Sequence, residues 1–154
     1  MHIGWLTGSA AVGTMRFSAE LQVLPQGVTF VADYATAAGF APTRVAKIEL
    51  AVGETLTNIC AYAYPKGGGE VEVQCTHDAG PRERIDIVDS GVPFDPLAVP
   101  PPDLLADPEE RTTGGLGIFL LRSIVDELTY RRDHDQNVLR LVIVPHPCAG
   151  LLTP

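Results

Sequence analysis

Residues 45–64, VAKIELAVGETLTNICAYAY, decide the fold of this chain. The apolar residues of this stretch recur at helical spacing and predict the buried face of a long helix; they are Val45, Ile48, Val52, Leu56, Ile59 and Ala63. Pro42 suits the first turn of that helix, and Pro65 ends it. The stretch therefore predicts a long helix packed on a core.

A second face of the same helix carries polar side chains. Glu54 and Asn58 stand four residues apart, so they project side by side. The small residues Ala51 and Ala61 are expected to leave the surface around them shallow. A carboxylate and a carboxamide on such a wall can bind a ligand, although the pair taken alone also describes an ordinary solvated helix face.

Length and composition indicate one domain. The chain has 154 residues, 45% of them hydrophobic, which suffices for one core and is too little for two ordinary domains. We expect a single domain over residues 1–154, with 1–14 a flexible leader or an irregular edge strand and 146–154 a loose tail. The formal net charge of -8 argues against nonspecific binding to nucleic acid or to an anionic membrane and favours soluble partners.

The cysteines and the N-terminal segment bear on the compartment. Cys60, Cys75 and Cys148 are odd in number and too widely spaced for a zinc knuckle or a redox motif, which indicates thiols in a reducing compartment. The N-terminal segment lacks the basic region and the apolar run of a signal peptide, and no segment has the length of a membrane span. The sequence thus predicts a cytoplasmic protein.

Hydrophobic patterning along the rest of the chain predicts strands that come mostly in adjacent pairs. In order, we expect a strand over 15–23, a helix over 28–38 ending at Gly39, the long helix, strands over 70–76 and 82–89, a helix opening at Gly114, and strands over 127–131 and 138–144. Paired strands with tight turns predict a mostly antiparallel sheet, so the fold class is an α/β (α+β) two-layer sandwich with three helices on one face. Residues 92–114 are rich in proline and lack periodicity, which is typical of a lid or a binding loop.

Three separated motifs carry a resemblance to a known family. Glu54-xxx-Asn58, the run DSGVPFDP over 89–96, and Gly114-Gly-Leu-Gly117 resemble the N, G1 and G2 boxes of the GHKL ATPases, which have the Bergerat fold. The wording GETLTNICAYAYPKGGGEVEV, DSGVPFDP and GGLGIFLLRSIVDELTY is similar to the anti-sigma-factor serine/threonine-protein kinases, the RsbW-like branch. The resemblance spans roughly residues 20–144.

The resemblance implies a role for each member of the helical pair. It makes Asn58 the magnesium ligand, and a carboxamide oxygen is a hard ligand that suits this ion. It makes Glu54 the catalytic base, which accepts a proton from an attacking hydroxyl.

The second motif implies an adenine pocket. Asp89 can accept a hydrogen bond from the exocyclic amino group of adenine, and Gly91 lets the backbone approach the flat ring. Pro93 departs from the DxGxG pattern of many GHKL proteins and matches the anti-sigma branch. Phe94 supplies an apolar wall there or belongs to the core. Without the family, the same residues also describe a plain Asp-Ser-Gly turn.

The third motif implies a phosphate site. Glycines before a helix, together with the free N–H groups of its first turn, favour an anion, and the residues concerned are Thr112, Thr113, Gly114, Gly115, Leu116 and Gly117. Arg111 and Arg122 can pair with a phosphate or a partner, or with other surface groups. A glycine-rich hinge before a helix, however, needs no ligand.

Taken together, the resemblance implies an ATP- and Mg²⁺-dependent protein serine/threonine kinase that acts as an anti-sigma factor. Its partners would be an anti-anti-sigma factor with a STAS domain, on which it phosphorylates a Ser or Thr, and a sigma factor controlled by partner switching. A homodimer is also implied. Two alternatives stay open: a nucleotide-binding interaction module that sequesters a partner without kinase activity, and a binding or structural α/β domain in which the glycines are hinges.

Overall fold

The computed structural model describes residues 3–4, 11–77, 82–101, 103, 105, 107 and 115–145. Its elements, in chain order, are β1 (Ile3–Gly4), β2 (Ala11–Ser18), α1 (Leu24–Ala37), α2 (Pro42–Asn58), a π-helical turn η1 (Ile59–Ala63), β3 (Glu70–His77), β4 (Glu83–Asp89), a 3-10 turn η2 (Pro96–Ala98), α3 (Gly115–Ile124), β5 (Glu127–Asp133) and β6 (Gln136–Ile143). Apart from β1, which lies in the segment 1–14 expected to be a leader or an irregular edge strand, the order of strands and helices is the one that the patterning predicts.

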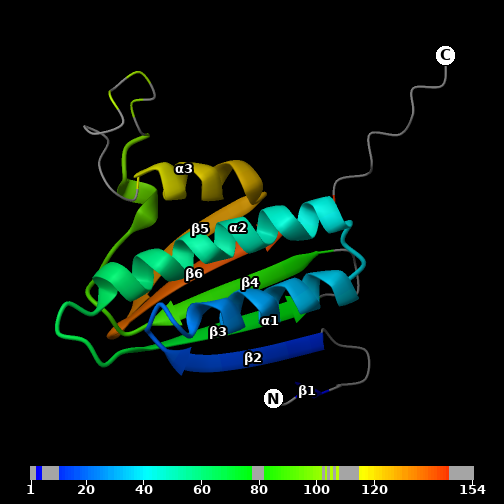
Figure 1. Cartoon of the computed structure of the whole chain (residues 1–154), viewed down its shortest axis with the longest axis horizontal. Helices are drawn as coiled ribbons and strands as arrows, with labels where there is room; N and C mark the ends of the chain where they lie inside the picture. Colours follow the sequence, from blue (N-terminus) through cyan, green and yellow to red (C-terminus); the bar gives the residue numbers. More distant parts are fainter. Residues whose placement is uncertain are drawn as a thin grey trace.

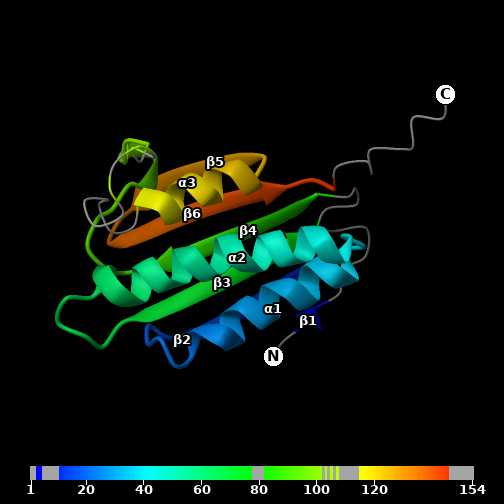
Figure 2. The ribbon, with the colours of Figure 1, turned by 45° about the horizontal axis from the view of Figure 1, so that its top comes forward.

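The strands form a single sheet in the order β1-β2-β3-β4-β6-β5, and every pair is antiparallel. Figures 1 and 2 show α1, α2 and α3 crossing the same face of this sheet, with α2 in the middle. The predicted two-layer sandwich is therefore confirmed. Because β6 lies between β4 and β5, the end of β4 and the start of β6 are neighbours in the sheet.

The first strand differs from its predicted bounds. β2 covers Ala11–Ser18, whereas residues 19–23 form a turn in which Val23 N donates to Glu20 O at 3.0 Å. The prediction of a strand over 15–23 is wrong at both ends because pairing decides them: β2 is matched to β3 over its whole length, from Ala11 opposite His77 to Ser18 opposite Glu70. α1 ends before Gly39, which has a φ of 88° as expected of a glycine that stops a helix.

The core lies between the helices and the covered face of the sheet. The apolar stripe predicted over 45–63 faces this core, with Ile48, Val52 and Leu56 fully buried. Ala51 is also fully buried, so its assignment to a shallow polar wall is wrong; a helix of this length, flanked by α1 and α3, buries more than one stripe. Ala61 is exposed.

A carboxyl group is buried in the part of the sheet where β3 ends and β4 begins. Glu83 has no solvent exposure, and within the described part of the chain neither of its oxygens has a hydrogen-bond partner. The groups that face it are His77 Nδ1 at 3.8 Å, the Cys75 thiol and the Tyr34 hydroxyl, which also lacks a partner there. Burial raises the pKa of Glu83 to about 7, and it raises the pKa of the Cys75 thiol as well.

No helix within the described ranges is long and apolar enough to cross a bilayer. The two cysteines that the structure describes, Cys60 and Cys75, form no disulfide; Cys148 lies outside the described residues.

Candidate functional site

The polar pair of the long helix lies against the first turns of α3. Glu54 and Asn58 are both half-buried on α2. A Cβ atom placed on Gly117 of α3 would lie 2.7 Å from Glu54 Oε2 and 3.7 Å from Asn58 Nδ2. The structure therefore brings the predicted N-box residues and the last glycine of the predicted G2 box together. A side chain at position 117 would fill the space beside the Glu54 carboxylate.

A second contact fixes the direction of α3 relative to α2. Arg44, in the first turns of α2, donates to Asp126 Oδ2 at 3.1 Å just beyond the C-terminal end of α3. Since Gly117 lies near the C-terminal half of α2 and Asp126 near its start, the two helices run antiparallel. The N-terminal end of α3, where free N–H groups favour an anion, thus faces the half of α2 that carries Glu54 and Asn58.

Asp89 ends β4 and is almost fully buried, with 6% of its surface exposed. Its Oδ1 accepts two hydrogen bonds, from Gly91 N and from Asn137 Nδ2, each at 2.9 Å. No hydrogen bond reaches Oδ2 from the residues that the structure describes. One carboxylate oxygen is thus held by the protein, and the other is an acceptor available to a ligand.

The backbone that follows Asp89 touches the end of the long helix. Val92 N donates to Ala63 O at 2.9 Å, and a Cβ on Gly91 would lie 2.5 Å from the same carbonyl oxygen. Only glycine allows this approach. The contact falls on η1, the widened turn in which α2 continues, and π-turns of this kind free helix carbonyls for other partners.

Tyr64 supports the same turn, a role that no sequence pattern indicated. Its hydroxyl accepts from Ser90 N at 2.7 Å and donates to Glu70 O at 2.6 Å. Burial raises the pKa of this hydroxyl, which keeps it a donor. Asn137, Tyr130 and Arg132 were missed as well; they lie on β5 and β6, and only the strand pairing brings them to Asp89.

The structure does not bring the remaining predicted residues into contact with Glu54, Asn58 or Asp89, or it does not describe them. Pro93 and Phe94 are exposed, so the alternative that Phe94 belongs to the core is wrong. Arg122 is not directed at a ligand: it donates to Leu97 O at 2.6 Å and to Pro96 O at 3.3 Å, which joins η2 to α3. Gly115 and Leu116 form the start of α3. The predicted residues Arg111, Thr112, Thr113 and Gly114 lie outside the described residues.

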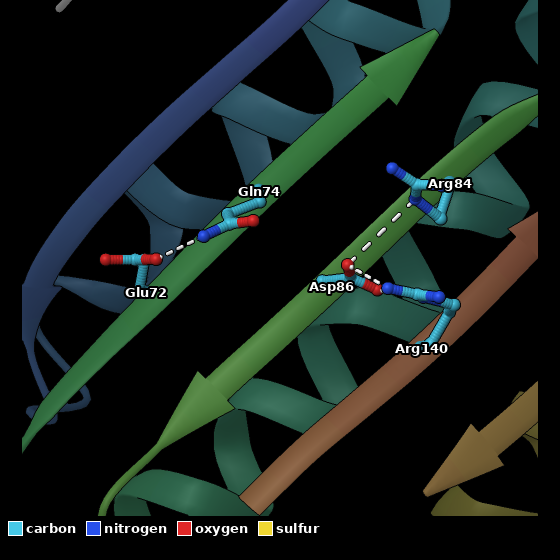
Figure 3. A network of polar contacts seen from close by, with 5 residues as sticks. All are labelled: Glu72, Gln74, Arg84, Asp86 and Arg140. Carbon is cyan, nitrogen blue, oxygen red and sulfur yellow. Dashed lines mark hydrogen bonds and ion pairs between the residues drawn. The ribbon is translucent and has the colours of Figure 1, made fainter. Parts of the chain in front are cut away.

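An open groove of about 400 Å³ on the opposite face of the sheet is lined by residues that include Asp86 and reaches Asp89 at its edge. Most of its charged side chains are in ion pairs, such as Arg16 with Glu72 and Arg131 with Asp133. Figure 3 shows Asp86 between two arginines and Glu72 joined to Gln74. Arg140 binds Asp86 through two hydrogen bonds of 2.7 and 2.8 Å, and Arg84 Nε is 4.0 Å from the same carboxylate. This groove is separate from the Glu54 and Asn58 pair, which faces away from the sheet toward α3.

Comparison with known proteins agrees with this arrangement. Residues 17–143 match the family described as "Histidine kinase-like ATPase domain". The proteins named "Serine-protein kinase RsbW" from Bacillus thuringiensis (strain Al Hakam) and Bacillus cereus (strain 03BB102) are each 29% identical to this chain over 113 residues, which is 71% of this chain and 70% of theirs.

Solved structures agree in fold. A structure of the RsbU and RsbW domains of Rv1364c from Mycobacterium tuberculosis superposes with a TM-score of 0.59 at 12% identity, over 86% of this chain and 31% of that one. The histidine kinase domain of the blue-light activated kinase EL346 from Erythrobacter litoralis gives a TM-score of 0.51 at 17% identity, over 92% and 70%. The chain thus spans about a third of the solved mycobacterial chain, and these two likenesses concern the fold alone.

Proposed function

The chain belongs to the family of histidine kinase-like ATPase domains, and from this membership we propose that it is an ATP-dependent serine/threonine protein kinase that acts as an anti-sigma factor. The observation that supports the proposal is the closeness of Glu54 and Asn58 to Gly117 at the start of α3, since a carboxylate and a carboxamide beside a helix N-terminus suit a base and a metal ligand. The distant relatives named as serine-protein kinases support the choice of a hydroxyl acceptor. Its substrate would be a Ser or Thr on a STAS-domain anti-anti-sigma factor.

The adenine end of the site would lie at the turn after β4. Asp89 Oδ2 is the free acceptor for the 6-amino group, since Oδ1 is already bonded twice. Gly91, which lacks a Cβ and so packs directly against Ala63, would hold the backbone of this turn in place beside the adenine ring.

The donor set at the other end fits magnesium and phosphate. Asn58 offers a carboxamide oxygen, and the first turn of α3 offers backbone N–H groups at the positive end of a ten-residue helix. Glycine at position 117 keeps the space beside these groups open. When bound, magnesium would neutralise charge on the phosphate oxygens.

Glu54 would receive the proton of the attacking hydroxyl. As the bond between the γ-phosphorus and the bridging oxygen of ATP breaks and ADP leaves, the hydroxyl oxygen of the partner forms the new bond to phosphorus. The proton of that hydroxyl then passes to the Glu54 carboxylate, which needs to be within hydrogen-bond reach of it in the complex.

The same proposal covers the setting of the reaction. The kinase would act in the cytoplasm as a homodimer and would hold a sigma factor in one state and the STAS-domain protein in the other. A single domain over residues 1–154 and a loose tail over 146–154 stay predictions; within 1–14, residues 3–4 and 11–14 belong to the sheet strands β1 and β2.

A transfer assay tests the function. The purified chain is incubated with Mg·ATP labelled at the γ-phosphate and with each STAS-domain protein of the same organism. Labelling of a Ser or Thr on one of them is the expected result. ATP binding without transfer to any of them would favour the sequestering module instead, and failure of the folded protein to bind ATP would remove the kinase proposal.

Changing Asp89 to Asn is expected to weaken ATP binding by at least about tenfold. Because Gly91 N and Asn137 Nδ2 both need an acceptor at Oδ1, the new amide nitrogen would replace Oδ2 and would face the amino group of adenine donor to donor. Calorimetric titration with Mg·ATP measures the change. Asp86→Asn, the same substitution on the opposite face of the same strand, is the control and should bind as the wild type does. Equal ATP affinity in Asp89→Asn would refute the adenine assignment.

Changing Gly117 to Ala is expected to slow transfer by about tenfold or more, while the fold is kept. The added methyl group would lie 2.7 Å from Glu54 Oε2, and the flexible end of that side chain has to move. The control is Gly53→Ala on α2, where a Cβ meets only Val28 Cγ2 at the ordinary distance of 3.9 Å. Melting temperature and transfer rate are measured for both variants. Unchanged transfer in Gly117→Ala would show that the position of Glu54 is not set by this contact.

A further inference from the structure

A buried amide on β6 holds the Asp89 carboxylate from behind. Asn137 is 5% exposed, and the register of β4 and β6 places it directly opposite Asp89. Its Nδ2 donates to Asp89 Oδ1 and also to Val92 O, both at 2.9 Å. One side chain therefore fixes both the carboxylate and the backbone of the turn that follows it.

Two neighbours on β5 decide which way this amide faces. The Tyr130 hydroxyl donates to Asn137 Oδ1 at 2.7 Å, and Arg132 donates to the same oxygen at 3.0 Å. If the amide were reversed, its NH₂ group would meet these two donors, and its oxygen would meet the carboxylate of Asp89. The pair on β5 thus keeps the donor side of Asn137 directed at Asp89.

Arg132 also reaches the turn itself. Its guanidinium donates to Gly91 O at 2.9 Å, in addition to its bond with Asn137. The β5–β6 hairpin consequently holds the turn through the Gly91 and Val92 carbonyl groups and the Asp89 carboxylate. Each of these groups has a hydrogen-bond partner within the network. Such a network is rigid, because moving one group breaks the hydrogen bonds of the others.

Building on the proposed function, we propose that Asn137, oriented by Tyr130 and Arg132, is a positioning residue that sets the purine specificity of the site. By occupying Asp89 Oδ1, it leaves Oδ2 as the acceptor that faces the base. An amino group at the purine 6-position donates to this oxygen, whereas a 6-keto group would set one acceptor against another. The specificity arises because the wrong base leaves a buried charged acceptor without its bond.

Calorimetric titration of the full chain with Mg·ATP and with Mg·ITP, whose base carries a 6-keto group, tests the proposal. The wild type should prefer ATP by about tenfold or more. Asn137→Asp keeps the shape but sets a second carboxylate against Asp89, so the ratio of ATP to ITP affinity should fall toward one. Tyr130→Phe removes one of the two donors that orient the amide, and its ratio should fall by about two- to fivefold.

Arg140→Ala is the matched control. Arg140 lies on the same strand as Asn137 but on the opposite face, where it binds Asp86 through two hydrogen bonds (Figure 3). Its loss removes a partly buried ion pair without touching Asp89. This variant should lose stability and keep the wild-type ratio of ATP to ITP affinity.

A measurement without nucleotide accompanies the titration. Gly91 N–H donates to Asp89 Oδ1, so its hydrogen exchange in the free protein reports whether the carboxylate is held in place. Exchange at Gly91 should be faster by about tenfold in Asn137→Asp and unchanged in Arg140→Ala. If Asn137→Asp does not fold, Tyr130→Phe tests the proposal instead, through the ratio of ATP to ITP affinity and the hydrogen exchange at Gly91.

The outcomes separate this inference from the function on which it rests. A wild type that binds neither nucleotide would overturn the proposed function and the inference with it. A wild type that prefers ATP, beside folded Asn137→Asp and Tyr130→Phe variants with the same preference, would overturn the inference alone.

Discussion

Replacing Glu54 by Gln lowers the rate of phosphoryl transfer by about 10²- to 10⁴-fold, the range that general-base catalysis contributes, and leaves ATP affinity within about twofold of the wild type. Glutamine keeps the size and the contacts of the side chain, including its position beside Gly117, but has no carboxylate to receive a proton. The loss therefore falls on the chemical step and not on binding. Single-turnover transfer to the STAS-domain partner and calorimetry with Mg·ATP measure the two quantities.

Glu49→Gln is the control for this prediction. Glu49 lies on the same helix five residues earlier, and at about 100° per residue it points to a different side of α2. It should transfer phosphate at the wild-type rate. Undiminished transfer by Glu54→Gln would show that another group takes the proton. Equal losses of transfer rate in Glu54→Gln and Glu49→Gln would show that the negative charge of α2, and not the position of Glu54, causes the loss.

Replacing Glu83 by Gln removes a fall in stability between about pH 4.5 and pH 7. The carboxyl group has an ordinary pKa of 4.5, and burial raises its pKa to about 7 in the folded protein. Between these values the folded state holds a proton that the unfolded state has lost, so the free energy of unfolding falls as pH rises. This rise of the pKa corresponds to about 3 kcal/mol, fully present below pH 4.5 and lost above pH 7.

The variant isolates this contribution. Glutamine is neutral at every pH, so above pH 7 Glu83→Gln should be more stable than the wild type by up to about 3 kcal/mol, and the difference should shrink toward acid pH. Denaturant unfolding at a series of pH values measures it. Glu127→Gln, whose side chain is 60% exposed in a surface pair with Arg82, should leave the pH dependence unchanged. Parallel curves for the wild type and Glu83→Gln would mean that Glu83 is not buried as a neutral acid.

Much of the fold could be predicted because the patterns are local. The stripe of apolar residues between Val45 and Ala63 and the alternation in β3 and β4 each lie within one element, and a period of 3.6 or 2 identifies them. The ends of β2 could not be predicted, since pairing with β3 sets them. Ala51 was misplaced because a small residue fits a shallow surface and a tight helix contact equally well.

The same distinction applies to the site. Glu54 and Asn58 are four residues apart, so their proximity follows from helix geometry alone. The support of Asp89 by Asn137 depends on strand register and on the insertion of β6 between β4 and β5, which no local pattern encodes. A polar residue at the start of an apolar strand was the only sign of it, and such a residue is equally common at an ordinary turn.

The hydrogen bond between Val92 N and Ala63 O has a consequence for how this chain can change over evolutionary time. The helical segment from Glu54 through η1 to Ala63 sets the distance and the rotation between the proposed catalytic base, Glu54, and the proposed adenine-binding turn after Asp89. Removing or inserting one residue between 54 and 63 would rotate one end against the other by about 100° and shift it by about 1.5 Å. Descendants of this protein can therefore exchange residues along that segment, but length variation has to accumulate elsewhere, as in the loop of residues 65–69.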